Sequence, residues 1–429
     1  MVMTKRGLVL GATALVLTTV AVTGAGLRMS KSQAFFQESP KELIDEVWQI
    51  INRTYLDGTF NQTDWKATRS QYLSRSYANQ EEAYKAVREM LKTLQDPYTR
   101  FMDPSEFKNM QIDTSGELTG VGIQITKDEK SKQLIVVSPI EGSPAAKAGV
   151  MSKDIIVEID GKNAEKLELE QAVNLIRGKA GTQVNITVQR GDKKVNFTLT
   201  RSKIEIHPVR ARVEDSPAGK IGYIRLNQFS AQASQDMRNA ITDLESKGVK
   251  GYVLDLRSNP GGLLYASVEI AKMWIPDGLI VSTVDRQGER EVQQADNKAL
   301  TDKPLVVLVN GGSASASEIL SGALQDHHRG TIVGTKTFGK GLVQSVRGLE
   351  DGSGLAVTIA KYLTPSGKDI NKDGIHPDVV YDLSDADRKA LQQAQEKIGT
   401  FDDPQFAKGF EVLKPEIEKT AKKGAQATK

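Results

Sequence analysis

The chain contains no cysteine, which excludes disulfides, thiolate metal sites and a cysteine nucleophile. Histidine is scarce, and no histidine lies in the H-E-x-x-H pattern of helical zinc sites. The four are His207, His327, His328 and His376. A net charge of +3 is too small to indicate a nucleic-acid-binding protein. The 429 residues, 39% hydrophobic and 26% charged, have an ordinary globular composition and allow roughly two to four domains.

The N-terminal segment has the pattern of a targeting sequence. Lys5 and Arg6 give it a basic start, and no charged residue occurs from Gly7 to Leu27. This length fits a long signal sequence or an uncleaved membrane anchor, and residues 32–34 (Ser-Gln-Ala) resemble a small-x-small cleavage site. We therefore predict that residues 1–34 direct export across a membrane, and we leave cleavage open.

Helical periodicity follows this segment. Apolar residues from Leu43 to Tyr55 recur at 3.6-residue spacing, and a second stripe runs from Gln80 to Thr93. Residues 96–99 (Asp-Pro-Tyr-Thr) form a turn signal. These patterns predict an N-terminal helical region over residues 35–115, with its aromatic side chains in the core.

Residues 116–202 alternate short strands and helices around a glycine-containing loop. The loop consists of Gly120, Val121, Gly122 and Ile123. Successive backbone N–H groups there can hold a terminal carboxylate, and the next strand can pair with the bound peptide. A short helix from Ser143 to Gly149, a strand at 154–160, a helix at 169–176 and a strand at 184–188 are expected next. This order resembles a PDZ domain, and a generic small β domain is the alternative.

Residues 203–383 alternate strands with helices, which is typical of an α/β fold. Two strands, 251–256 and 304–309, are nearly continuous apolar runs, and each leads into a glycine-containing turn and then a helix. The first turn is Asn-Pro-Gly-Gly at 259–262, and the second carries three serines. Ligand sites of α/β folds lie at such strand ends, so both turns are expected in one site. For residues 384–429 we predict a helix to about Lys419 and then a disordered tail.

Ser315 and Lys340 are the candidate catalytic pair within this region. Ser315 precedes a helical run, so the N–H of Ala316 is placed to face an oxyanion. A lysine accepts a proton only when it is neutral, which requires burial or nearby positive charge to lower its pKa. The apolar walls are expected from Phe338, Leu342 and Val343.

Other interpretations of these residues remain open. Ser315-x-x-Glu318 is also a capping box, and Lys340 can be a solvated loop lysine. Residues 334–340 fit the G-x-x-x-x-G-K phosphate loop, but Gly341 replaces the Ser or Thr that binds magnesium, and a strand is expected next instead of a helix. A phosphate-loop NTPase and a non-catalytic PDZ binding module are therefore the alternatives to an enzyme of the Ser-Lys type.

Two motifs carry a family resemblance. Residues 313–318 (Ser-Ala-Ser-Ala-Ser-Glu) and 337–341 (Thr-Phe-Gly-Lys-Gly) resemble the active-site signature of the carboxy-terminal processing (tail-specific) serine proteases, in particular members from photosynthetic organisms. The resemblance covers nearly the whole chain after residue 34. It implies an α/β multidomain protein with an N-terminal helical segment, a PDZ domain and a crotonase-like α/β protease core.

The resemblance also implies roles for individual residues. Ser315 is implied as the nucleophile, Lys340 as the base and Gln344 as the residue that orients the lysine. Gly261, in the Asn-Pro-Gly-Gly turn, is implied as the second oxyanion donor beside Ala316. Arg177 matches an arginine that couples the PDZ domain to the active site in some members, and a surface arginine at a helix end is an equal alternative.

The predicted function is a serine endopeptidase with a Ser-Lys-Gln site that cleaves exported proteins near their C-termini. The PDZ domain is expected to bind the substrate C-terminus through Gly120 to Ile123, in the periplasm or the thylakoid lumen. No cofactor or metal is implied, because the calcium-loop pattern that starts at Asp369 has Val380 where glutamate is required. The expected partners are protein substrates and no nucleic acid, and membrane association through residues 1–34 is left open.

Overall fold

The computed structural model describes residues 39–128, 131–140, 142–288 and 290–427. The predicted targeting segment, residues 1–34, lies outside these ranges. Among the described helices, none combines the length and the apolar character that a membrane span requires.

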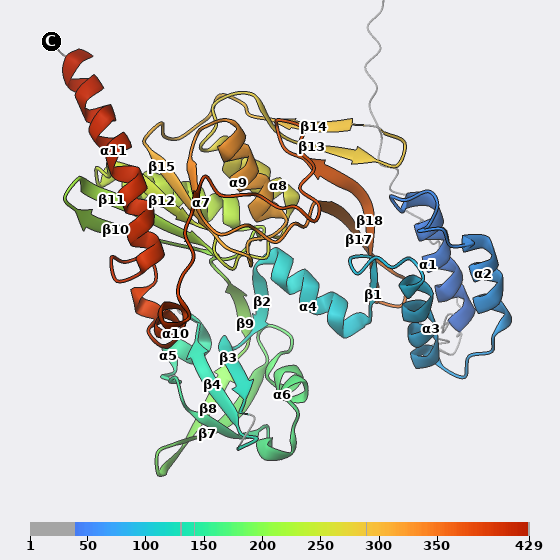
Figure 1. The fold of residues 1–429 in the computed structure, drawn as a ribbon. Helices are drawn as coiled ribbons and strands as arrows, with labels where there is room; N and C mark the ends of the chain where they lie inside the picture. Colours follow the sequence, from blue (N-terminus) through green and yellow to red (C-terminus); the bar gives the residue numbers. More distant parts are fainter. Residues whose placement is uncertain (1–38, 129–130, 141, 289, 428–429) are drawn as a thin grey trace, which may run out of the picture. The chain divides into compact units, whose positions relative to one another are not determined.

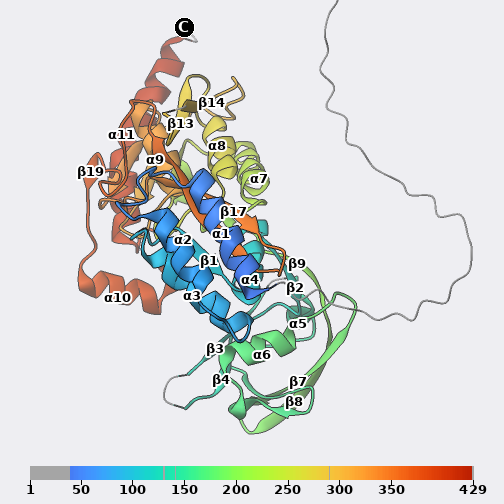
Figure 2. The same ribbon diagram turned by 90° about the vertical axis from the view of Figure 1, so that its right-hand side faces the viewer.

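Three helices open the described chain, and they pack side by side (Figures 1 and 2). They are α1 (Pro40–Thr54), α2 (Trp65–Ser74) and α3 (Gln80–Lys92). Asp64 and Asn79 cap α2 and α3 by accepting backbone N–H bonds. The apolar stripe of α1 is buried against α3, as its spacing predicts, so the two predicted helical stripes are confirmed.

The region predicted as helical also contributes a strand to a sheet formed later in the chain. After the turn at Asp96, β1 (Arg100–Met102) pairs antiparallel with β18 (Gly354–Leu363), which lies far along the chain. The prediction of a wholly helical region is therefore wrong at this point, because a three-residue strand leaves no periodicity to detect. Next, α4 (Pro104–Ser115) begins at an Asp103–Glu106 capping box and ends at Gly116, whose φ is 69°.

The region predicted as a PDZ domain forms a largely antiparallel sheet with two helices. Its strands follow the order β3-β4-β5-β7-β8, with β6 beside β5, and its apolar side chains form a separate core. The chain enters on β2 and leaves on β9, which pair with each other. The elements are β2 (Glu117–Gly120), β3 (Ile123–Lys127), β4 (Leu134–Pro139), α5 (Pro144–Lys147), β5 (Ile155–Ile159), β6 (Lys162–Asn163), α6 (Leu169–Ile176), β7 (Gln183–Arg190), β8 (Lys193–Thr200) and β9 (Ser202–Glu205).

The remaining chain builds a sheet of order β10-β11-β12-β15-β16-β19, parallel from β11 onward. Helices α7, α8 and α9 pack on one face, and α11 contacts the strands from the other (Figure 1). Its elements are β10 (Val209–Ser216), β11 (Gly219–Leu226), α7 (Ala233–Ser246), β12 (Gly251–Asp255), α8 (Leu264–Lys272), β15 (Leu305–Val309), α9 (Ala316–Asp326), β16 (Thr331–Gly334), β19 (Val379–Val380) and α11 (Pro404–Ala427).

A second sheet lies beside the first and contains β1, β18, β13 (Leu279–Asp285) and β14 (Arg290–Gln294) in that order. Its remaining strand, β17 (Leu342–Gly348), pairs with β18 and follows directly after Lys340. A strand at this position contradicts the phosphate-loop interpretation, which requires a helix.

One local prediction, concerning the end of α11, fails. The tail after Lys419 was expected to be disordered, but α11 continues to Ala427. Its apolar side chains, including Phe406, Leu413 and Ile417, pack on the sheet, and this packing outweighs the polar composition of its last turns.

Candidate active site

Ser315 occupies a strained turn between β15 and α9. Its backbone angles are φ 54° and ψ −113°, a conformation that is costly for a residue with a Cβ and that is found where a strand-to-helix turn presents a nucleophile. The neighbouring serines have other partners. Ser313 Oγ donates to Leu256 O at 2.8 Å, and Ser317 Oγ donates to Asn259 O at 2.9 Å. Both of these hydroxyls therefore tie the serine turn to the turn after β12.

Glu318 joins the Ser315 turn to the lysine loop, a link that the sequence did not reveal. Its carboxylate is fully buried and accepts four hydrogen bonds. Oε2 accepts from the N–H groups of Ser315 (2.8 Å) and Lys340 (2.9 Å). Oε1 accepts from Gly339 N (2.7 Å) and Thr337 Oγ1 (2.5 Å). The capping-box pattern indicated only the first of these bonds, and a buried carboxylate that binds both loops fixes the distance between them.

Lys340 lies in a partly buried environment that the N-terminal region helps to form. Its Nζ lies 5.0 Å from the centre of the Tyr98 ring. Burial lowers the pKa of Lys340 below its usual value, the positive charge of Arg100 lowers it further, and Asp96 and Glu318 act in the opposite direction. The expected wall residue Phe338 is instead 58% exposed, so that prediction is wrong. Tyr98 lies just before β1, and Arg100 is the first residue of that strand. No local sequence pattern places them beside a lysine so distant in sequence.

The hydroxyl of Ser315 and the amine of Lys340 are not hydrogen-bonded to each other in the described residues. Tyr362 is a buried phenol whose pKa is raised by burial, and Ser315 acts on this pKa in the opposite direction. Tyr362 also donates its backbone N–H to Gly341 O at 2.8 Å, next to the lysine. Gln344, which the resemblance implies as the residue that orients Lys340, forms no hydrogen bond to it within the described part of the chain, and its Nε2 is buried and unpaired there. A register shift between Val343 and Gln344 interrupts the alternation of side chains along β17 at this point.

The two candidate oxyanion groups lie close together. A Cβ on Gly261 would lie 2.9 Å from Ala316 N and 2.9 Å from the Cβ of Ser315, so only glycine permits this approach. The φ of Gly261 is 98°, which also favours glycine. Its N–H donates to Asn259 Oδ1 at 2.9 Å, whereas the N–H of Ala316 is the first of α9 and has no intrahelical acceptor.

A buried ionic cluster lies beneath both turns. Arg257, two residues before the Asn-Pro-Gly-Gly turn, donates to Asp255 at 2.6 Å and to Asp403 at 2.7 Å. Burial acts to raise the pKa of Asp255, but Arg257 holds it below its usual value. Gln405 bonds both Arg257 Nη1 (3.3 Å) and Val309 O (3.2 Å), at the end of β15. The start of α11 therefore supports the strand ends that carry the candidate site, which the sequence did not indicate.

The predicted carboxylate-binding loop lies between β2 and β3. Val121 O accepts from Ala145 N at 2.9 Å, and Gly122 O accepts from Ile140 N at 2.8 Å, which holds the loop against α5. A Cβ on Gly122 would lie 2.3 Å from the Cβ of Ser143, so the close contact requires glycine.

Arg177 lies at the end of α6 and extends from the PDZ region to α4. Its Nη1 donates to Asn109 Oδ1 on α4. Burial lowers the pKa of Arg177, and Asp113 on the same helix acts against this shift. The arginine is therefore a bridge between two elements rather than a solvated side chain.

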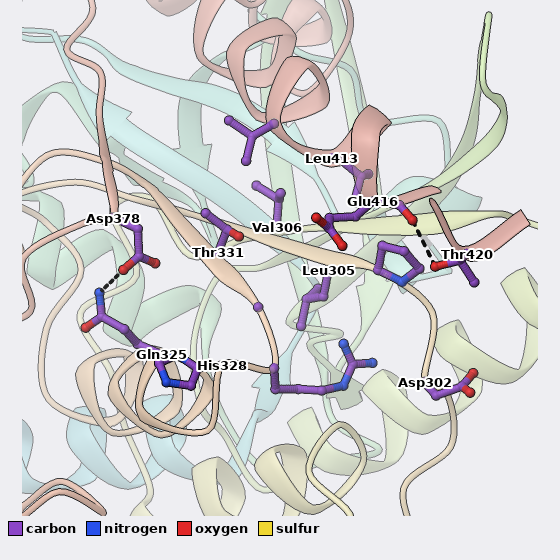
Figure 3. A pocket seen from close by; sticks show the side chains of 14 residues that line it. Asp302, Leu305, Val306, Gln325, His328, Thr331, Asp378, Leu413, Glu416 and Thr420 are labelled. Carbon is purple, nitrogen blue, oxygen red and sulfur yellow. Dashed lines mark hydrogen bonds between the residues drawn. The ribbon is translucent and has the colours of Figure 1, made fainter. Parts of the chain in front are cut away.

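A cavity of about 520 Å³ lies beside the N-terminal ends of β15 and β16, whereas the candidate site follows the C-terminal ends of the strands (Figure 3). Figure 3 shows Asp302, Gln325, His328 and Glu416 around it, with Gln325 bonded to Asp378. None of the candidate catalytic residues lines it. Within the described residues there is also no cluster of three or more His, Asp or Glu side chains able to hold a metal ion.

Comparison with known proteins gives consistent matches. The family profile described as Peptidase family S41 matches residues 220–381, and the one described as PDZ domain matches residues 135–190. The carboxyl-terminal-processing protease of Synechocystis sp. is 49% identical over 350 residues, which cover 81% of this chain and 82% of that protein. Carboxyl-terminal-processing peptidase 2, chloroplastic, of Arabidopsis thaliana is 42% identical over 345 residues, covering 78% and 67%.

A solved structure agrees with these sequence matches. The photosystem II D1 C-terminal processing protease is 40% identical to this chain, covers 80% of it and 94% of its own length, and has a TM-score of 0.54. The predicted fold class and the prediction of a serine-type hydrolase are thereby confirmed. This chain belongs to peptidase family S41, as a PDZ-containing serine protease of the carboxyl-terminal-processing type.

Proposed function

We propose that this protease cleaves exported proteins near their C-termini, with Ser315 as nucleophile and Lys340 as general base. The observation that carries the proposal is the strained backbone of Ser315, whose two neighbouring serines are bound to backbone carbonyls while Glu318 holds the lysine loop beside it. Strain of this kind is maintained where a side chain must be presented for chemistry.

The proposed reaction has two stages. Neutral Lys340 takes the proton of Ser315 Oγ as the oxygen attacks the scissile carbonyl carbon, and the oxyanion is bound by the N–H groups of Ala316 and Gly261. The lysine then protonates the leaving amine, so the peptide bond breaks and an acyl-enzyme remains. In the second stage Lys340 takes a proton from water, the hydroxide attacks the ester, and Ser315 recovers its proton as the acid leaves.

This proposal requires a side-chain movement. Lys340 Nζ, which lies near the Tyr98 ring, turns toward the hydroxyl of Ser315. The backbone can stay in place, because Glu318 binds the N–H groups of both residues. Gln344 is proposed to accept a hydrogen bond from Nζ through its Oε1 once the lysine has turned. Similarly, Gly261 N–H leaves or shares its bond to Asn259 when the oxyanion forms.

We also propose that the loop from Gly120 to Ile123 holds the substrate carboxylate and that Arg177 relays this binding to α4. The support is the bond from Arg177 to Asn109 and the short distance from Gly120, whose added Cβ would lie 4.0 Å from Arg177 Cγ. Protein substrates with free C-termini are then the partners. Export to the periplasm or the thylakoid lumen fits the basic and uncharged N-terminal pattern and the chloroplastic relative.

The test compares three serine variants. Ser315→Ala should lose labelling by a fluorophosphonate probe and lose cleavage of a peptide with a free C-terminus, with the products identified by mass spectrometry. Ser313→Ala and Ser317→Ala should keep both, with some loss of stability because each removes one buried hydrogen bond to a backbone carbonyl. Labelling of Ser315→Ala at the normal rate would show that another residue is the nucleophile. A non-catalytic binding module would show no labelling of any form.

A further inference from the structure

A second cavity, of about 580 Å³, is lined by residues that closely follow the two candidate catalytic loops in sequence and by several arginines. Leu264 and Val343, which line it, follow Gly262 and Lys340 by two and three positions. Ser345 and Arg347 on β17 also line this groove. Both follow the register shift between Val343 and Gln344, so they alternate regularly along the strand and share the face that forms one wall of the groove.

Four arginines from three separate parts of the chain meet around this groove. They are Arg53 at the end of α1, Arg286 after β13, Arg290 on β14 and Arg347 on β17. Two carboxylates, Asp285 and Glu291, also line it, so the arginines are in excess. Within the described residues, none of the four arginines forms an ion pair with a carboxylate: the side-chain bonds of Arg53 and Arg286 go to the backbone oxygens of Gln49 and Asn52.

These observations favour an anionic ligand. Guanidinium groups that lack a carboxylate partner and surround one groove bind planar oxyanions such as a side-chain carboxylate. The apolar floor, with Leu264, Val343 and Ile359, suits a peptide more than a small polar anion, because it can bury aliphatic side chains between the charged positions. Lining residues two and three positions from Gly262 and Lys340 connect the groove to the loops of the candidate site along the chain.

We propose that this arginine groove is a substrate subsite that binds acidic side chains of the polypeptide being cleaved. The inference rests on the proposed function. A substrate extended along β17 advances one residue for each strand residue, about 3.3 Å. Val343 and Arg347 lie three and seven positions after Lys340, which is placed at the scissile bond. They therefore correspond to substrate residues about three to seven positions from that bond. An Asp or Glu in that window is recognised, whereas the same residue farther away is not.

The experiment uses the full chain and two pairs of peptides. The members of a pair differ only in having two Glu or two Gln residues, four and six positions from the scissile bond. These residues lie on the N-terminal side of the bond in the first pair and on the C-terminal side in the second. In one of the two pairs, the wild type should cleave the Glu peptide with a kcat/KM about threefold to tenfold higher than that of the matching Gln peptide. This ratio of the two kcat/KM values should fall as the salt concentration is raised. The ratio should approach one in Arg290→Gln/Arg347→Gln. It should persist in the control Arg210→Gln, which removes an exposed arginine from β10.

Binding separates this proposal from the proposed function. Fluorescence anisotropy with Ser315→Ala should show tighter binding of the same acidic peptide, with the difference lost in Ser315→Ala/Arg290→Gln/Arg347→Gln. If peptides bind with this preference but the wild type cleaves neither, the groove stands and the proposed catalysis fails. If both peptides bind and are cleaved equally at low salt, or if the double variant keeps the preference, the groove proposal is overturned while the protease mechanism stands.

Discussion

The carboxylate of Glu318 provides a sharp test of how the active site is held together. Glu318→Gln keeps the size of the side chain but replaces one oxygen by an NH2 group, which cannot accept a hydrogen bond. If the NH2 takes the place of Oε2, the N–H groups of Ser315 and Lys340 are unpaired. If the NH2 takes the place of Oε1, the N–H of Gly339 is unpaired. The Thr337 hydroxyl loses the same acceptor, but it can rotate and direct its hydrogen elsewhere, which a backbone N–H cannot do.

The magnitude follows from these bonds. One or two buried N–H groups without an acceptor cost about 1–3 kcal/mol each, so we expect a loss of roughly 1–6 kcal/mol in the free energy of unfolding. Because the two loops are then no longer fixed to each other, kcat should fall by about 100-fold or more, as expected for a displacement of about 1 Å between reacting groups. Both quantities are measurable, by denaturant titration and by peptide cleavage.

A pH profile distinguishes positioning from general destabilisation. The negative charge of Glu318 raises the pKa of Lys340, so its removal should lower that pKa and move the alkaline rise of any residual activity to lower pH. Glu245→Gln is the matched control, since Glu245 accepts bonds from Tyr252 and Lys303 away from the site. It should lower stability without moving the profile. A Glu318→Gln enzyme with normal stability and normal kcat would refute the role assigned to this carboxylate.

Three further predictions concern the base and the substrate terminus. Burial and Arg100 lower the pKa of Lys340, so activity should rise with pH around a midpoint below the usual lysine pKa, and Arg100→Gln should move that midpoint upward; an unchanged profile would contradict it. Lys340→Arg should be folded, bind peptide and cleave nothing, because arginine stays protonated; near-normal cleavage would exclude lysine as the base. Amidation of a peptide C-terminus should weaken its binding in a titration, and equal affinity would show that Gly120 to Ile123 do not read the carboxylate.

The sequence predicted the parts of this protein that local chemistry determines. Apolar periodicity located α1 and α3, and glycine-containing turns after apolar strands located the turns of Gly261 and Ser315. Short motifs were enough to propose Lys340 as the catalytic base, because the residues of a family signature are close together in sequence.

What the sequence did not predict depends on long-range contacts. Tyr98 and Arg100 reach Lys340 only because β1 pairs with β18. The side chain of Asp403 reaches Arg257 only because α11 packs on the sheet. The failed predictions have the same origin, because both relied on local composition alone. Phe338 was expected to form an apolar wall around Lys340, and the final turns of α11 were expected to be disordered.

The packing of α11 has a consequence for a protease, because the polypeptide of the enzyme is itself a potential substrate for other copies. Proteolysis requires an extended strand of substrate, and a helix keeps its backbone groups in internal bonds that must first be broken. Phe406, Leu413 and Ile417 hold this helix on the sheet, and the buried ion pair of Asp403 with Arg257 anchors its beginning. The packing of residues 404–427 as α11 thus protects this segment from cleavage by neighbouring copies of the enzyme, because the helix must unwind before it can be cut.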